Sequence, residues 1–340
     1  MPKIVVAVAL AVAAGVLATG CARPAPKETA IDHFVRGEML MQGGDVDAAL
    51  AELAQAVRAD PELSIAYAAI GDIHRRRESW ELARAAYETA CQTNPYAFRA
   101  HYNLALTYQT LAQQAASAVE KVRELLEKAV AVYLRAIELS PDDFDSHLNI
   151  SACYFELGDL DKAEEYCQAA VQIDPNSAEA YSNLGMIDEC QNKLYEAIKA
   201  YKASLEQDAH QPELLVQLGS AYMRQGRLKA ALESFNAAAQ EDPSSSVPWE
   251  KTGACYFYLR DFAKAQEAYS KALNLDPGSA AAHRGMGVAY MSQYIMNRSR
   301  ADLRDKALDE WNTSLDIQPD QEDLKRLVKK YTPVYEEPKL

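Results

Sequence analysis

The sequence is poor in the residues and motifs that mark most enzymes and nucleic-acid-binding proteins. Glycine and proline number 14 each in 340 residues, and no P-loop, GxSxG or HExxH motif occurs. Lysine and arginine total 35 against 49 aspartates and glutamates, which gives a net charge of -14. Because nucleic-acid binding relies on basic residues at phosphates, this balance argues against it. It favours basic partners or simply soluble helix faces. We expect no catalytic residue, no enzyme activity and no nucleic-acid partner.

Cysteine and histidine are scarce, with six of each, and they are not spaced as metal ligands. Free cysteine is among the most buried residue types, so the cysteines after residue 21 are interpreted as packing residues. Four histidines share one site of the repeat described below, and they too are interpreted as packing residues: His33, His101, His147 and His283. We expect no metal, no other cofactor and no small-molecule substrate.

The chain has one long apolar run, at its N-terminus. Lys3 precedes an apolar run over residues 4–17, and small residues lead from Ala18 to Cys21. This order is typical of a secretory signal peptide, which we place at residues 1–20. A cleaved signal without lipid and an uncleaved membrane anchor are the alternatives.

The end of this signal resembles a bacterial lipobox, although Ala18 stands where leucine is usual and Leu17 lies one residue earlier. The resemblance implies that Cys21 is lipidated and anchors the chain in the bacterial cell envelope. Ala22 is not aspartate, which by resemblance to Gram-negative lipoproteins implies the periplasmic face of the outer membrane. Residues 21–29, rich in proline and charge, are expected to form a tether.

The rest of the chain repeats one pattern, clearest in residues 144–175. Apolar residues recur there at spacings of three and four, which predicts two amphipathic helices. Gly158 can end the first helix in a left-handed conformation, and Asp159 can cap the second. Asp174 and Pro175 end the pattern, because the residue before proline is pushed out of helical geometry.

Prolines mark this pattern along the chain, with a period of 34 residues. Ala209 stands where one proline is missing, and two spacings carry insertions of 12 and 8 residues. A fixed period of this length indicates a solenoid. We place eight repeats at residues 30–61, 64–95, 98–141, 144–175, 178–209, 212–243, 246–277 and 280–319. A capping helix is expected at residues 320–331, and a tail at 332–340.

Small residues recur at fixed repeat sites. One site in each second helix is always alanine: Ala49, Ala83, Ala129, Ala163, Ala197, Ala231, Ala265 and Ala307. One site in each first helix is always small: Gly37, Gly71, Ala105, Ser151, Gly185, Gly219, Gly253 and Gly287. Small residues let helix axes approach closely, so these sites predict the contacts between helices.

This pattern over residues 30–319 resembles the tetratricopeptide repeat (TPR). The resemblance implies an all-α fold, an α-solenoid wound as a right-handed superhelix. Its concave face is lined by first helices and binds peptides or proteins, without chemistry of its own. From the repeat phase we place these residues in the groove: Tyr102, Asn103, Leu148, Asn149, Phe155, Asn183, Met186, Gln217, Met223, Phe257 and Tyr258.

Four of these residues place an amide at one repeat site: Asn103, Asn149, Asn183 and Gln217. In some TPR superhelices asparagine pairs with the backbone of an extended peptide, so the resemblance makes this ladder a candidate. The alternative is that asparagine stands at this site for reasons internal to the repeat. Of two insertions, the one at 112–123 is expected to lengthen the helices of the third repeat, and the one at 294–304 is expected to form a loop. The second is basic, and it is either a docking edge or a solvated loop.

The functional hypothesis is a lipid-anchored envelope scaffold that binds a protein or peptide and helps assemble a secretion, pilus or cell-wall complex. One alternative is a substrate-recruiting subunit of an enzyme complex, such as a glycosyltransferase or a protease. Another is a soluble co-chaperone, although the two-carboxylate clamp of lysine and asparagine in such proteins is not evident.

Overall fold

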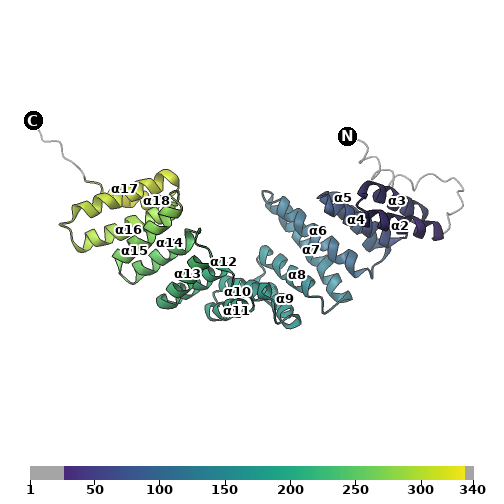
Figure 1. Ribbon diagram of the computed structural model, residues 1–340, viewed down its shortest axis with the longest axis horizontal. Helices are drawn as coiled ribbons and strands as arrows, with labels where there is room; N and C mark the ends of the chain where they lie inside the picture. Colours follow the sequence, from purple (N-terminus) through teal and green to yellow (C-terminus); the bar gives the residue numbers. More distant parts are fainter. Residues whose placement is uncertain (1–26, 334–340) are drawn as a thin grey trace, which may run out of the picture. The chain divides into compact units, whose positions relative to one another are not determined.

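The computed structural model describes residues 27–333, and this part of the chain is helical (Figure 1). Within it lie seventeen helices and no β-strand. The predicted signal peptide, Cys21 and most of the predicted tail lie outside the described residues. Helix α2 begins at Lys27, so the last three residues of the expected tether, 27–29, are helical.

The helices form eight pairs, each with a first and a second helix. The first helices are α2 (Lys27–Gln42), α4 (Ser64–Arg76), α6 (Phe98–Gln114), α8 (Phe144–Leu157), α10 (Ala178–Cys190), α12 (Pro212–Arg224), α14 (Val247–Tyr258) and α16 (Ala280–Met296). The second helices are α3 (Val46–Ala59), α5 (Trp80–Thr93), α7 (Val119–Leu139), α9 (Leu160–Ile173), α11 (Leu194–Gln207), α13 (Leu228–Glu241), α15 (Phe262–Leu275) and α17 (Ala301–Ile317). The chain ends in α18 (Glu322–Tyr331).

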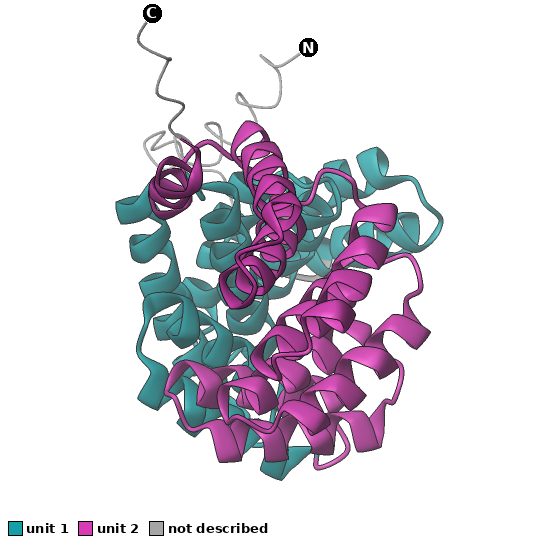
Figure 2. Ribbon diagram, turned by 90° about the vertical axis from the view of Figure 1, so that its left-hand side faces the viewer, with its two compact units in different colours: residues 1–174 teal, residues 175–340 magenta. Residues whose placement is uncertain are grey.

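The pairs divide between two compact units, coloured separately in Figure 2. Unit one ends at Asp174 and contains α2 to α9. Unit two begins at Pro175 and contains α10 to α18. In each unit a second helix packs on its pair mate and on the first helix of the next pair. The fold is therefore an α-solenoid.

The fourth pair shows how local sequence ends each helix. Gly158 has a φ of 82°, the left-handed conformation that glycine adopts without a Cβ clash. The Asp159 side chain accepts a hydrogen bond from the backbone N–H of Lys162 and caps α9. Where the fifth pair lacks its proline, Gln211 donates to the carbonyl oxygens of Ser204 and Asp208 at 3.4 and 2.7 Å. An amide side chain thus satisfies the end of α11 there.

The small sites lie where helices touch. The recurring alanine of every second helix is 0% exposed, as the repeat alignment predicted. The recurring glycine of the first helix lies against a large side chain of its own pair: a Cβ on Gly185 would lie 2.4 Å from the Tyr201 ring. The fourth pair has Ser151 instead, and the facing residue is Cys167. Volume is therefore exchanged between the two sites, as close packing requires.

The insertion of the third pair lengthens its helices as expected. The loop expected at 294–304 is wrong in extent, because only residues 297–300 lie outside α16 and α17 and the insertion lengthens these helices too. In the third pair α6 and α7 have 17 and 21 residues, and in the eighth pair α16 and α17 have 17 each. Helix α18 then covers the last pair, where its Leu324 is fully buried in a cluster with Trp311 and Met291. Without such a cover the apolar face of the last pair would be open to water.

Candidate functional site

Within each unit the successive first helices share a face, and the name first-helix face is used here for repeat positions two, five, six, nine and twelve of each first helix. These positions are three or four residues apart, so they share one side of a helix. Neighbouring first helices touch within each unit, as α6 does with α8 and α12 with α14. The predicted groove residues lie on this first-helix face, apart from Tyr258, which is one position beyond it.

In unit one the predicted residues are partly exposed or just covered. Tyr102, Asn149 and Phe155 are half-buried, whereas Asn103 and Leu148 are buried. Tyr102 packs its ring near Phe98 and Tyr133, with ring centroids 6.3 and 6.1 Å away. The aromatic side chains here are therefore held in place by neighbouring rings while an edge stays accessible.

In unit two all but one of the predicted residues are half-buried. The exception is Tyr258, which is 64% exposed. The half-buried set is Asn183, Met186, Gln217, Met223 and Phe257. Met, Tyr and Phe are types that are enriched in interface cores.

The amide row is largely engaged inside the fold. Asn103 Nδ2 donates to Asp72 Oδ1 at 3.1 Å, and Asn149 Nδ2 donates to the Tyr102 hydroxyl at 3.3 Å. Each of these bonds reaches the preceding first helix. Gln217 Nε2 likewise faces Met186 Sδ at 3.9 Å, while its Oε1 is buried without a partner among the described residues. Sequence could place the amides in register but could not show that they join neighbouring repeats.

Each unit also has a carboxylate that links first and second helices. In unit one Asp72 Oδ1 accepts from the Tyr87 hydroxyl at 2.5 Å, and Arg75 lies 4.0 Å away. In unit two Glu189 accepts from the Tyr201 hydroxyl at 2.8 Å and pairs with Arg224 at 2.9 Å. Burial first, and then these carboxylates, raise the pKa of both tyrosines, so the hydroxyls act as donors.

Two family models match the chain. The family described as "Tetratricopeptide repeat" matches residues 8–64, 34–98 and 122–178. A second family, described as the cilia and flagella-associated protein 70 C-terminal domain, matches residues 179–287. The chain is a tetratricopeptide-repeat protein.

Solved structures show the same TPR fold. The C-terminal part of a TPR repeat-containing protein from Cytophaga hutchinsonii is 16% identical, with a TM-score of 0.61, and covers 78% of this chain and 98% of its own. Pseudomonas aeruginosa PilF is 20% identical, with a TM-score of 0.50, and covers 65% of this chain and 96% of its own. No curated protein matches the sequence. As a TPR protein, the chain is a protein–protein interaction scaffold.

The structure places three further exposed residues on the first-helix face, and the groove prediction missed them. Ile31, Ile65 and Val247 are exposed, and all three occupy repeat position two of a first helix. Other TPR repeats have charged residues there, such as Arg99 and Glu213. A comparison of repeats at this position would have found them, because an exposed β-branched residue stands out among charges.

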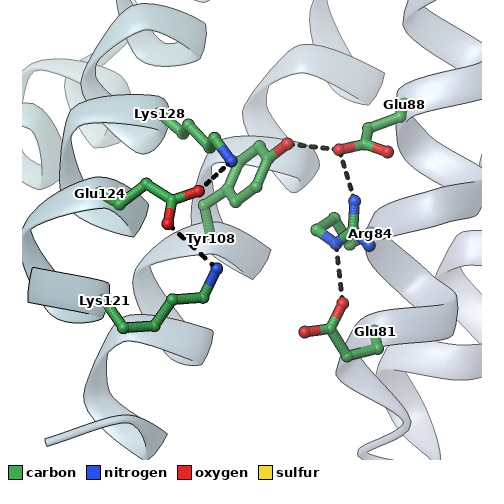
Figure 3. A network of polar contacts seen from close by, with 7 residues as sticks. All are labelled: Glu81, Arg84, Glu88, Tyr108, Lys121, Glu124 and Lys128. Carbon is green, nitrogen blue, oxygen red and sulfur yellow. Dashed lines mark hydrogen bonds and ion pairs between the residues drawn. The ribbon is translucent and has the colours of Figure 1, made fainter. Parts of the chain in front are cut away.

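On the second-helix side of unit one, charged residues form hydrogen bonds and ion pairs with one another (Figure 3). Arg84 bonds to Glu81 and Glu88, and Tyr108 of α6 donates to Glu88. Burial, and the bond to Glu88, raise the pKa of Tyr108 to about 12. On α7, Glu124 lies between Lys121 and Lys128 in the same view. The charges of Arg84 and Glu124 are thus satisfied by their neighbours, so these residues offer less to a partner.

Within residues 27–333 no cluster of three or more histidine, cysteine or acidic side chains is placed to hold a metal ion. None of the described helices combines the length and the apolar character that a membrane span needs. Cys91, Cys153 and Cys255 have raised thiol pKa values, chiefly from burial, whereas Cys190 is exposed and free. Among the cysteines that the structure describes, Cys190 is therefore the one open to reagents.

Proposed function

We propose that this TPR protein is a non-catalytic, envelope-anchored scaffold that binds a segment of a partner protein on its first-helix face. The observation that supports this most is the contrast between its two sides. The first-helix face leaves apolar residues partly open, including Tyr102, Phe155 and Met223. On the second-helix side of unit one, Arg84 and Glu124 are held in ion pairs with their neighbours.

The chemistry of the face suits a peptide with spaced apolar side chains. Half-buried aromatic rings and methionines give shallow apolar contacts that adapt to different side chains. The buried, unpartnered Gln217 Oε1 marks a point at which an added hydrogen-bond donor would be favourable after a small side-chain movement. An amphipathic helix or an extended segment is the ligand class that fits.

The anchoring part of the proposal rests on sequence. The apolar run before Cys21 has the order of a signal peptide, and its end resembles a lipobox. Lipid on Cys21 would hold the repeats beside the membrane while the scaffold engages its partner. Assembly of a multi-protein complex in the bacterial envelope, at the periplasmic face of the outer membrane, is the role that combines these two properties.

Co-purification from detergent-solubilised envelopes tests the proposal. The variant Phe155→Ala with Met223→Ala removes one apolar contact from the face in each unit. We expect partner recovery to fall at least about tenfold, since buried hot-spot side chains are worth about 1–2 kcal/mol each.

The matched control is Tyr195→Ala, which removes an exposed aromatic side chain from the second helix α11. It should leave recovery unchanged, and circular dichroism should show the same helicity for all variants. Equal losses for Tyr195→Ala and for the face variant would refute a role specific to the first helices.

A further inference from the structure

The extra helical turns that the two insertions add differ sharply in character. In the third repeat the extra turn of α6 ends in Gln113 and Gln114, which are exposed and polar. In the eighth repeat the equivalent residues of α16 are Ile295 and Met296, and they are 46% and 67% exposed. A structural extension needs no apolar tip, as the third repeat shows, so this tip requires another explanation.

The apolar tip borders a hollow inside unit two, called here the α16 notch. The notch holds about 360 Å³ and is lined by Phe257, Tyr258, Arg260, Phe262, Ile295 and Met296. Its floor is aromatic and ordered, with the Phe257 ring 5.6 Å from Phe262 and 6.0 Å from Tyr258, centroid to centroid. A second hollow of about 610 Å³ shares Arg260, Phe262 and Met296 and extends to Arg300.

One basic side chain, Arg260, lines the notch in an otherwise acidic protein, and the insertion that supplies Ile295 and Met296 is itself basic. Arg260 and Arg298 have no carboxylate partner within the described part of the chain, and Arg298 lies over the Tyr294 ring at 6.0 Å. Arg300 is paired with Asp302 at 2.7 Å, and Asp261 is engaged by Lys264 at 3.1 Å. The Arg260 guanidinium, which lines the notch with the exposed Ile295 and Met296, is thus left for an outside anion.

Arg260 is also held in an unusual backbone conformation. Its φ is 60°, in the left-handed region; the equivalent turn residue is glycine in three repeats, whereas Glu78 and Asn192 share the conformation of Arg260 in two others. Glycine would adopt this conformation without strain, so arginine here is tolerated at a cost to stability. Its side chain lines both hollows.

We propose that the α16 notch is a second docking site, and that it binds an acidic protein segment carrying large apolar side chains. Its apolar residues would enter the notch, and a carboxylate would pair with Arg260, since guanidinium groups bind carboxylates in bidentate geometry. The notch lies at the turn edge of unit two; it shares Phe257 with the first-helix face, but its proposed role does not depend on a partner at that face.

Selection from a displayed library of random peptides on the full chain, purified in detergent, tests the proposal. We expect enriched peptides that combine glutamate or aspartate with aromatic residues or leucine, and that bind less tightly as salt is raised. Ile295→Gln with Met296→Gln copies the tip of the third repeat and should weaken these peptides at least about tenfold. Gln113→Ala with Gln114→Ala is the matched control and should change nothing.

Arg260→Gly separates a binding role from a structural one. This variant should keep or raise the unfolding temperature, because it relieves the backbone, and yet weaken the enriched peptides about threefold or more. Phe155→Ala should leave their binding intact, which distinguishes the notch from the first-helix face.

Three results would overturn the proposal. The first is that the selection enriches no peptide. The second is that the enriched peptides bind the Ile295→Gln, Met296→Gln variant with full affinity. The third is that peptides whose binding depends on the notch are not acidic. If the selection enriches no peptide, and the protein sediments with phosphatidylglycerol vesicles while the Ile295→Gln, Met296→Gln variant does not, the surface is assigned to lipid instead.

Discussion

Gly219 lies directly over the ring of Phe235: a Cβ added to the glycine would stand 2.5 Å from Cε1 of that ring. The two residues belong to the first and second helix of one repeat, α12 and α13. Contact this close is possible only without a side chain on the first helix. It explains why glycine persists inside a helix, where it costs roughly 1 kcal/mol relative to alanine.

Gly219→Ala should therefore destabilise the protein. Overpacking costs about 1–3 kcal/mol, and the helical preference of alanine returns part of it, so we expect a net loss of about 1–2 kcal/mol. Urea denaturation followed by circular dichroism measures this. Combined with Phe235→Leu, the residue type that repeat one has as Leu53, the loss should be smaller than the sum of the single changes. Additive losses would show that the two side chains do not meet.

Tyr87→Phe should lower stability by about 1–2 kcal/mol, because it removes a hydrogen bond to the charged Asp72. Tyr269 occupies the same repeat position, and its hydroxyl has no hydrogen bond within residues 27–333. Tyr269→Phe is therefore the matched control, and we expect little change in its denaturation midpoint. A similar loss for both variants would indicate that the Asp72 bond contributes nothing of its own.

Because His101 has a lowered pKa in the folded protein, we expect the protein to lose stability on the acid side of neutrality. Burial lowers its pKa below 6.5, and nearby Arg135 lowers it further. As the pH falls through 6.5, the unfolded chain therefore binds more protons than the folded chain. The stability that is present above pH 6.5 is lost as the pH falls from 6.5 toward the lower pKa of the folded state. His74 has its pKa lowered in the same way and adds to the effect.

Thermal denaturation across roughly pH 7.5 to 5.5 measures this loss, a window set by the unperturbed histidine pKa. His101→Tyr, which installs the residue found at this site as Tyr67 and Tyr181, should reduce it. His210 is the control, because it is exposed and its pKa is raised by Glu241. His210→Gln should leave the loss in place. An unfolding temperature that rises on acidification would contradict the prediction.

Repeat phase predicted much of this fold because each repeat solves the same packing problem. Alanine at the recurring second-helix site and glycine opposite a ring follow from steric limits that act within one repeat. The destinations of side chains between repeats were not predictable in this way. The Asn103 bond to Asp72 depends on which residue the preceding repeat offers, and no period encodes that.

The candidate sites divide along the same line. The sequence placed Phe155 and Met223 on first helices, and they lie on that face. It did not distinguish the polar tip of one insertion from the apolar tip of the other. The α16 notch depends on how the end of α14, the start of α15 and the extra turn of α16 meet in the folded protein, and the sequence pattern does not specify this.

Cys21→Ser should abolish lipid attachment and release the protein to a soluble fraction. Lipidation depends on the thiol at the end of the lipobox-like stretch, which serine does not supply. Metabolic labelling with a fatty-acid precursor and fractionation measure the two effects. A variant that still incorporates the label, or that stays membrane-integral, would rule out lipid on Cys21.

The central claim is that a partner lies on the first-helix face, and Cys190 provides the most direct measurement. This free, exposed thiol ends α10, one turn beyond Met186. A photoreactive maleimide placed on it in envelope preparations should crosslink a specific partner segment, identified by mass spectrometry. The control is Glu233→Cys in a Cys190→Ser background, which moves the probe to an exposed site on the second helix α13. We predict adducts from Cys190 and none from the control; the same adducts from both sites, or none from Cys190, would contradict the claim.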